Sequence, residues 1–120
     1  MLNNLKDYEH YIISMRRHFH MYPEVGGQEF KTQQKIIEEL RSFGLDPKPI
    51  AGTGVIAEVT GAGPGKTVAI RADIDALPLQ DEIQTEYCSK HPGICHACGH
   101  DGHIAMALGT AKVFAANRNS

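Results

Sequence analysis

The chain has 120 residues, of which 42% are hydrophobic and 22% are charged, and its formal net charge is −2. This composition is typical of one folded domain over residues 1–120 and excludes an intrinsically disordered chain. Lysine and arginine are scattered, and no apolar run is long enough to cross a bilayer, so neither nucleic acid nor a membrane is an expected partner.

The N-terminal part of the sequence predicts two helices. Apolar side chains recur at alternating steps of three and four residues, which is the spacing of one helix face, over 3–20 and again over 28–43. We expect the first helix to end by Tyr22, because a proline disfavours helical backbone in the residue before it. Gly44 is the expected end of the second helix.

The middle of the sequence changes to a strand pattern. Two β-branched runs, "GVIAEVT" and "KTVAIRADI", are separated by "GAGPG" and predict antiparallel strands at 54–60 and 66–72. A shorter strand at 47–51 is a further candidate. A long irregular segment follows, and a last helix is predicted at 102–117 with Asp101 as its N-cap. This order of elements predicts part of an α/β layer structure.

The stretch "CHACGHDGH" offers four metal ligands within six residues: Cys95, His96, Cys98 and His100. A closed structural zinc site needs a second ligand pair, and the sequence has no second C-x-x-C. A redox dithiol expects a preceding strand, whereas loop residues flank this motif. An open catalytic metal site is therefore favoured, with Cys98 and His100 as ligands. Asp101 is expected either to cap the helix or to hold a histidine ring.

The stretch "RADIDALP" is the second chemical landmark. Asp73 and Asp75 alternate at the end of a predicted strand, where sheets in α/β proteins carry their sites. Alone, two acids would simply end a strand and start a turn; beside the Cys and His cluster they favour a metal site. The pair Glu38 and Glu39 is interpreted as a solvated helix face, and Cys88 as a packing residue.

Four blocks carry a family resemblance: "RRHFHMYPE", "GTGVIAEVTG", "AIRADIDALPLQD" and "HPGICHACGHDGHIAMALGTAKVF". In order and spacing they resemble the N-terminal part of the two-metal amidohydrolases and peptidases that include hippurate hydrolase, N-acyl-amino-acid amidohydrolases and indole-acetyl-amino-acid hydrolases. The resemblance implies an incomplete catalytic domain with a di-metal exopeptidase-like fold, in which helices pack on a mixed sheet that lacks its later strands and the dimerisation domain. It also implies hydrolysis of N-acyl amino acids by metal-activated water.

The resemblance assigns roles to particular residues. Cys98 and His100 match the ligands of two divalent ions (Zn, Mn, Co or Ni), with the cysteine bridging them, and Asp75 matches an acid that steadies a ligand from behind. Asp73 stands where related branches have a metal-binding histidine, and the resemblance implies that this branch has moved that role elsewhere. The glutamate base and the remaining ligands correspond to positions beyond Ser120, so we expect the chain alone to be inactive. The full-length form is expected in the cytoplasm and is a candidate homo-oligomer.

Cys95 departs from the family pattern, which most often has methionine there. We interpret Cys95 as a small apolar substitute. The alternative hypothesis is a small non-enzymatic module whose structural zinc is bound by Cys95, Cys98, His100 and either His96 or His103. The two hypotheses make opposite predictions for the effect of Cys95→Ala on zinc binding.

Overall fold

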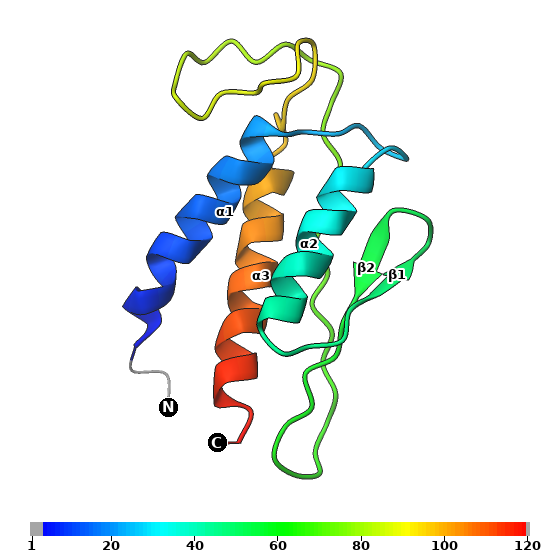
Figure 1. Ribbon diagram of the computed structural model, residues 1–120, viewed down its shortest axis with the longest axis vertical. Coiled ribbons are helices and arrows are strands. Elements are labelled where there is room, and N and C mark those ends of the chain that lie inside the picture. The colour runs from blue at the N-terminus through cyan, green and yellow to red at the C-terminus, as the bar shows by residue number, and fades with distance from the viewer. Residues whose placement is uncertain (1–3, 120) are drawn as a thin grey trace.

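Three helices form the bulk of the structure, a computed structural model that describes residues 4–119. Helices α1 (Glu9–Met21) and α3 (His100–Asn117) lie side by side, and α2 (Phe30–Ser42) packs on the other side of α3 (Figure 1). A single 3-10 turn, η1 (Leu5–Tyr8), precedes α1. No helix within the described residues is long and apolar enough to cross a membrane.

The ends of the first two helices have clear local causes. Helix α1 ends at Met21, before Pro23, as predicted. Gly44 follows α2 with a φ of 82°, the left-handed conformation that glycine adopts without strain. The start of α2 is capped from a distance, because the carboxylate of Glu24 accepts hydrogen bonds from the backbone N–H and the hydroxyl of Thr32 at 2.6 and 2.7 Å. The turn at 22–29 is thereby fastened to α2.

The sheet within the described residues is a two-stranded hairpin. Strands β1 (Lys48–Ile50) and β2 (Gly54–Ile56) pair antiparallel, with Pro49 opposite Val55. The candidate strand at 47–51 thus forms, and the predicted pairing of 54–60 with 66–72 is wrong. A tight turn gives β2 its partner, because Ala51 and Gly52 both adopt positive φ, 51° and 84°. The turn at Ala51 and Gly52 is shorter than the loop at 61–65, so closing it costs less conformational entropy than the predicted pairing would.

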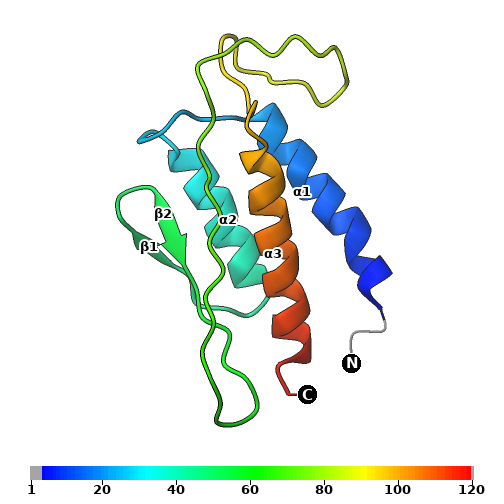
Figure 2. The same cartoon turned by 180° about the vertical axis from the view of Figure 1, so that it is seen from behind.

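The segment after β2 brings the acidic residues to α3. Figure 2 shows this chain running out to a loop and returning as an extended segment past α2 toward the N-terminal end of α3. Ile74 packs against the core from this segment. The core itself is a cluster contributed by the helices and the residues just after α2: Phe19, Ile36, Leu40, Leu45, Ile104 and Leu108. This non-helical segment therefore places Asp73 and Asp75 beside the first turn of α3.

Candidate metal centre

The N-terminal end of α3 differs from the sequence prediction. The helix begins at His100, two residues early, and its N-cap is Gly99 with a φ of 87°. The prediction of Asp101 as N-cap is wrong, because the left-handed glycine lets the helix start before it. Asp101 instead lies in the first turn with a 2% exposed side chain, and its carboxylate accepts a hydrogen bond from His20 Nδ1 at 2.8 Å. Asp101 therefore holds a histidine ring, but that ring is His20 on α1, whereas the prediction concerned a metal-binding histidine.

His100 is oriented by Asp75. The Nδ1 of His100 lies 2.9 Å from the carbonyl oxygen of Asp75 and 3.0 Å from its Oδ1. Because both atoms are acceptors, Nδ1 carries the proton in the neutral ring, and Nε2 presents a lone pair. A carboxylate behind a histidine is the usual arrangement that fixes a metal-binding ring.

Three potential ligands converge beside this ring. Among the described residues, Asp73, His100 and His103 form the one group whose ligand atoms all lie within 4.8 Å of one another. His100 Nε2 is 3.9 Å from Asp73 Oδ2, and the rings of His100 and His103 are 5.3 Å apart. His103 follows His100 by three residues and so lies on the same face of α3. Cys98 is exposed and lies outside this group.

Cys95 behaves as a packing residue. Its side chain belongs to the buried set, with 7% of the residue exposed, and its backbone pairs with Leu77 through N–H···O contacts of 3.1 and 2.9 Å. Burial raises the pKa of the Cys95 thiol, with smaller contributions from Asp81 and Asp101. A thiol kept protonated is a poor ligand, because the thiolate is the form that binds metals.

His96 is buried without a partner. It is 5% exposed, and within residues 4–119 neither ring nitrogen has a hydrogen-bond partner. Burial lowers the pKa of His96, so the neutral ring is favoured. A buried donor without a hydrogen-bond partner costs about 1–3 kcal/mol of stability. The interior near the metal-ligand candidates therefore holds a polar side chain, His96, that the described residues leave unpaired.

A buried network that the sequence did not reveal supports the α3 terminus. His20 links Asp101 to Asp81, whose Oδ2 lies 3.1 Å from His20 Nε2. Arg16 Nε contacts the same Asp101 oxygen at 2.9 Å. Asp81 also accepts the backbone N–H of Ser89 at 2.9 Å, and this bond chiefly lowers the pKa of Asp81. The sequence signal for this network was weak: His20 lies next to the apolar Phe19 near the end of the predicted first helix.

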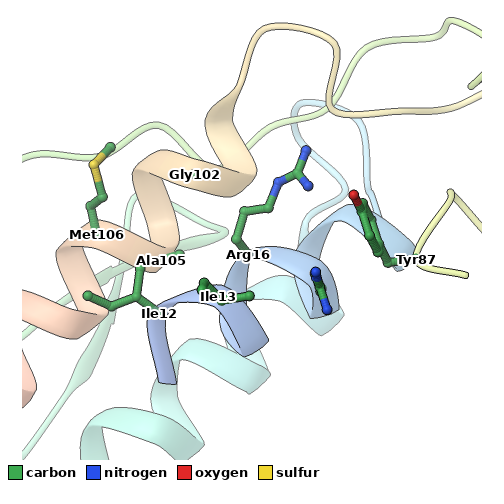
Figure 3. A pocket seen from close by; sticks show the side chains of 8 residues that line it. Ile12, Ile13, Arg16, Tyr87, Gly102, Ala105 and Met106 are labelled. Carbon is green, nitrogen blue, oxygen red and sulfur yellow. The ribbon is translucent and has the colours of Figure 1, made fainter. Parts of the chain in front are cut away.

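The outer rim of this network opens into a groove between α1 and α3. Figure 3 shows Arg16 reaching across the groove toward Tyr87, with Ile13 and Met106 on the walls. The Arg16 guanidinium carbon lies 5.4 Å from the centre of the Tyr87 ring, within cation–π range. None of the three converging ligands lines this groove, so it is a surface separate from the cluster.

Comparisons with known proteins relate the chain to a family of hydrolases. Residues 69–120 match the peptidase family M20/M25/M40. Over 109 residues the chain is 53% identical to an N-acyl-L-amino acid amidohydrolase of Geobacillus stearothermophilus, covering 90% of this chain and 30% of that protein. It is 45% identical to an N-acetyl-L-cysteine deacetylase of Bacillus subtilis, covering 98% and 28%.

A solved structure supports the same relationship. The YXEP protein of Bacillus subtilis, described as a dinuclear metal-binding peptidase of family M20, superposes with a TM-score of 0.88 at 42% identity. The match covers 94% of this chain and 32% of that one. The chain thus spans about 30% of the length of the relatives it matches. The expected α/β fold class agrees with this neighbour.

Proposed function

We propose that this chain forms part of the catalytic domain of a metal-dependent amidohydrolase that acts on N-acyl amino acids, because residues 69–120 match the peptidase family M20/M25/M40. The relatives named above are hydrolases of amide bonds, and two carry names with N-acyl amino acid substrates. The substrate is therefore a small molecule in this proposal.

The observation that carries the proposal is the prepared histidine at the start of α3. Asp75 holds Nδ1 of His100 so that Nε2 is free to bind an ion. Cys98, two residues earlier, is exposed and carries no disulfide, so its thiolate is accessible as a second ligand. Sulfur and imidazole ligands together suit Zn, Co or Ni, and Mn less well.

The donor set fits the chemistry that the reaction requires. When bound, divalent ions lower the pKa of a water molecule and polarise the carbonyl of the scissile amide. In this proposal Cys98 and His100 hold the ions, and Asp75 keeps the His100 ring in one tautomer. The resemblance assigns the role of general base to a glutamate, and the cluster contains none. We therefore expect the 120-residue chain alone to show little or no hydrolysis.

A chimaera tests this function directly. The Geobacillus amidohydrolase, carrying this chain's matched residues in place of its own, is loaded with Zn²⁺, Co²⁺ or Mn²⁺ and assayed on a panel of N-acyl amino acids. We expect hydrolysis, and we expect Cys98→Ala to lower kcat/KM at least about 100-fold, since ligand loss exceeds the usual effect of losing a residue that only supports a ligand. Cys88→Ala, at a half-buried free cysteine, is the matched control.

A folded, metal-loaded chimaera that hydrolyses none of these substrates would overturn the proposal. The alternative, a structural zinc module, predicts instead that Cys95→Ala weakens zinc binding by the isolated chain as much as Cys98→Ala does. The burial of Cys95 and the raised pKa of its thiol favour a silent Cys95→Ala. The same proposal includes localisation in the cytoplasm and assembly into homo-oligomers. Cell fractionation and sedimentation, applied to a protein of the relatives' length, test these two properties.

A further inference from the structure

We propose that the groove between α1 and α3 is a binding site for a small amphipathic carboxylate, an anion with a carboxylate head and an alkyl tail. The groove has a volume of about 360 Å³, which is within the range of small-molecule sites in proteins. It is separate from the metal-ligand cluster, so binding there requires no ion. The choice of a carboxylate as the anion rests on the proposed function, because hydrolysis of an N-acyl amino acid releases the acyl chain as a carboxylate.

The groove has two different ends because α1 and α3 run in opposite directions (Figure 1). Arg16 and Arg17 lie near the C-terminal end of α1, and the N-terminal end of α3 lies beside them. One helical turn away, Ile12 of α1 and Met106 of α3 line the same groove. Figure 3 shows Arg16 and Tyr87 at one end and Ile12 and Met106 at the other. The first end is polar and the second is apolar.

The apolar end of the groove has room for an alkyl tail. Ile13 and Met106 are 42% and 55% exposed, so their apolar surface is in contact with water that a tail would displace. The flexible thioether of a methionine adapts to the shape of a bound chain. At Gly102 an added Cβ atom would meet no heavy atom of a neighbouring element within 4 Å, so the groove is open beside the first turn of α3.

The polar end carries positive charge. The guanidinium carbons of Arg16 and Arg17 lie 5.4 and 4.7 Å from the centre of the Tyr87 ring, and these cation–π contacts restrain both side chains. Arg16 is also paired with the buried Asp101, whereas within residues 4–119 Arg17 takes part in no ion pair. None of the described residues that line the groove is acidic. Arg17 is therefore the cation available to a carboxylate, which a guanidinium binds through two parallel hydrogen bonds.

The two ends together select an amphipathic anion. An inorganic anion would leave Ile13 and Met106 in water, and an uncharged alkyl chain would leave Arg17 without a partner. A carboxylate with an alkyl tail satisfies both, since its head lies against Arg17 while its tail runs between α1 and α3. Decanoate, kept below the concentration at which it forms micelles, is the simplest probe of this kind.

Calorimetric titration of decanoate into the 120-residue chain tests the inference, with EDTA present so that no metal ion contributes. We expect saturable binding. Arg17→Gln should weaken decanoate binding about tenfold, because it removes charge-assisted hydrogen bonds, and should leave the binding of decanol nearly unchanged. Gly102→Leu should weaken the binding of both ligands at least about tenfold, because its side chain fills the groove. Arg41→Gln, at an exposed arginine of α2, is the matched control and should change the affinity less than about twofold.

The methyl resonances of methionine locate the bound probe. In spectra of the chain labelled at its methionine methyl groups, decanoate should shift the resonance of Met106, which lines the groove. The resonance of Met15, which packs against the core, should stay in place. Shifts at Met15 with none at Met106 would place the ligand elsewhere and overturn the inference.

Equal decanoate affinity in the unmodified chain, Arg17→Gln and Gly102→Leu would also overturn it, as would an absence of saturable binding or equal affinity for decanol and decanoate. Binding to phosphatidylglycerol vesicles without binding of monomeric decanoate would do the same, because the groove would then recognise a lipid surface. Leucine is favoured over glycine within a helix, and circular dichroism verifies that each variant keeps its helices. Because the titration involves neither metal nor hydrolysis, its failure is distinct from a failure of the chimaera to hydrolyse N-acyl amino acids.

Discussion

Individual polar side chains decide how firmly the first turn of α3 is held. Asp81 is the clearest case, because its 6% exposed carboxylate accepts hydrogen bonds from the backbone of Ser89 and faces His20. The hydrogen bond from Ser89 lowers the pKa of Asp81 more than burial raises it. The charged carboxylate is thus stabilised by folding, and loop 81–89 is tied to α1 and, through His20, to α3.

This linkage predicts a pH dependence. The pKa of Asp81 is lower in the folded state than in the unfolded state, where it is about 3.9. The stabilisation is therefore complete above that pH and is lost as the pH falls through the folded value. We expect Asp81→Asn to reduce the free energy of unfolding at pH 7 by about 1–2 kcal/mol, and the difference from wild type to shrink below about pH 4.

Urea denaturation between pH 3 and 7 measures this difference. Asp46→Asn is the control, because the Asp46 side chain is 81% exposed and pairs with Lys48 on the surface. Exposed ion pairs contribute about 0–1 kcal/mol, so this control should remain near wild type. A destabilisation by Asp81→Asn that stayed constant down to pH 3 would contradict the role assigned to its charge.

At the scale of elements, the close approach of α1 and α3 depends on one glycine. A Cβ atom added at Gly109 would lie 2.6 and 2.7 Å from side-chain atoms of Ile12. These distances are too short for carbon atoms in contact, so a side chain at Gly109 would require the Ile12 side chain or the helices to move. The interface in turn positions the first turn of α3 against His20.

Two alanine substitutions on α3 should therefore have opposite effects. Alanine is more favourable than glycine in a helix by about 0.5–1 kcal/mol. Gly102→Ala should stabilise the chain by this difference in helix propensity, because nothing lies within 4 Å of the added Cβ atom. Gly109→Ala also forces a shift against Ile12, which costs about 1–3 kcal/mol, and should destabilise it. Thermal unfolding measures both.

A double-mutant cycle identifies the cause. Ile12→Ala removes the atoms that clash, so Gly109→Ala should be less destabilising in that background. If Gly109→Ala stabilised the chain as Gly102→Ala does, the proposed crowding at the helix crossing would be wrong.

At the scale of the whole molecule, the extended segment after β2 leaves apolar side chains uncovered. Val68 and Ile70 are 82% and 62% exposed, and on the hairpin Ile50 and Ile56 are 48% and 54% exposed. An uncovered β-branched segment with free backbone groups is a template for strand pairing between molecules. The molecule is also flat, with extents of 47 × 32 × 21 Å, so a large share of its surface is available for such contacts.

Reducing this apolar surface should reduce self-association. The double variant Val68→Thr, Ile70→Thr keeps the β-branched shape while lowering the hydrophobicity of the segment. We expect a lower weight-average mass in sedimentation equilibrium and an unchanged thermal midpoint, because neither side chain belongs to the core. The control is Thr67→Ser on the same segment. An unchanged mass would show that this segment does not drive association.

The sequence by itself determined the local features of this protein. Helical spacing located α2, α3 and the end of α1 to within two residues, because an apolar stripe is a property of neighbouring residues. The predicted start of the first helix at residue 3 lies outside the described residues, and α1 begins at Glu9 after a 3-10 turn. The blocks around Asp75, Cys98 and His100 carried the resemblance to the family, since residue types and their spacing can be read directly from the chain. Cys95 was correctly interpreted as apolar in character, and its burial gives the reason.

Only the tertiary structure decided which distant residues meet. The pairing of β1 with β2, the start of α3 at Gly99, and the link from His20 to Asp101 depend on backbone conformation and on contacts across up to 81 residues. The grouping of Asp73 with His100 and His103 is of the same kind. Sequence periodicity carries no information about such approaches, because they arise from the packing of the extended segment against the end of a helix.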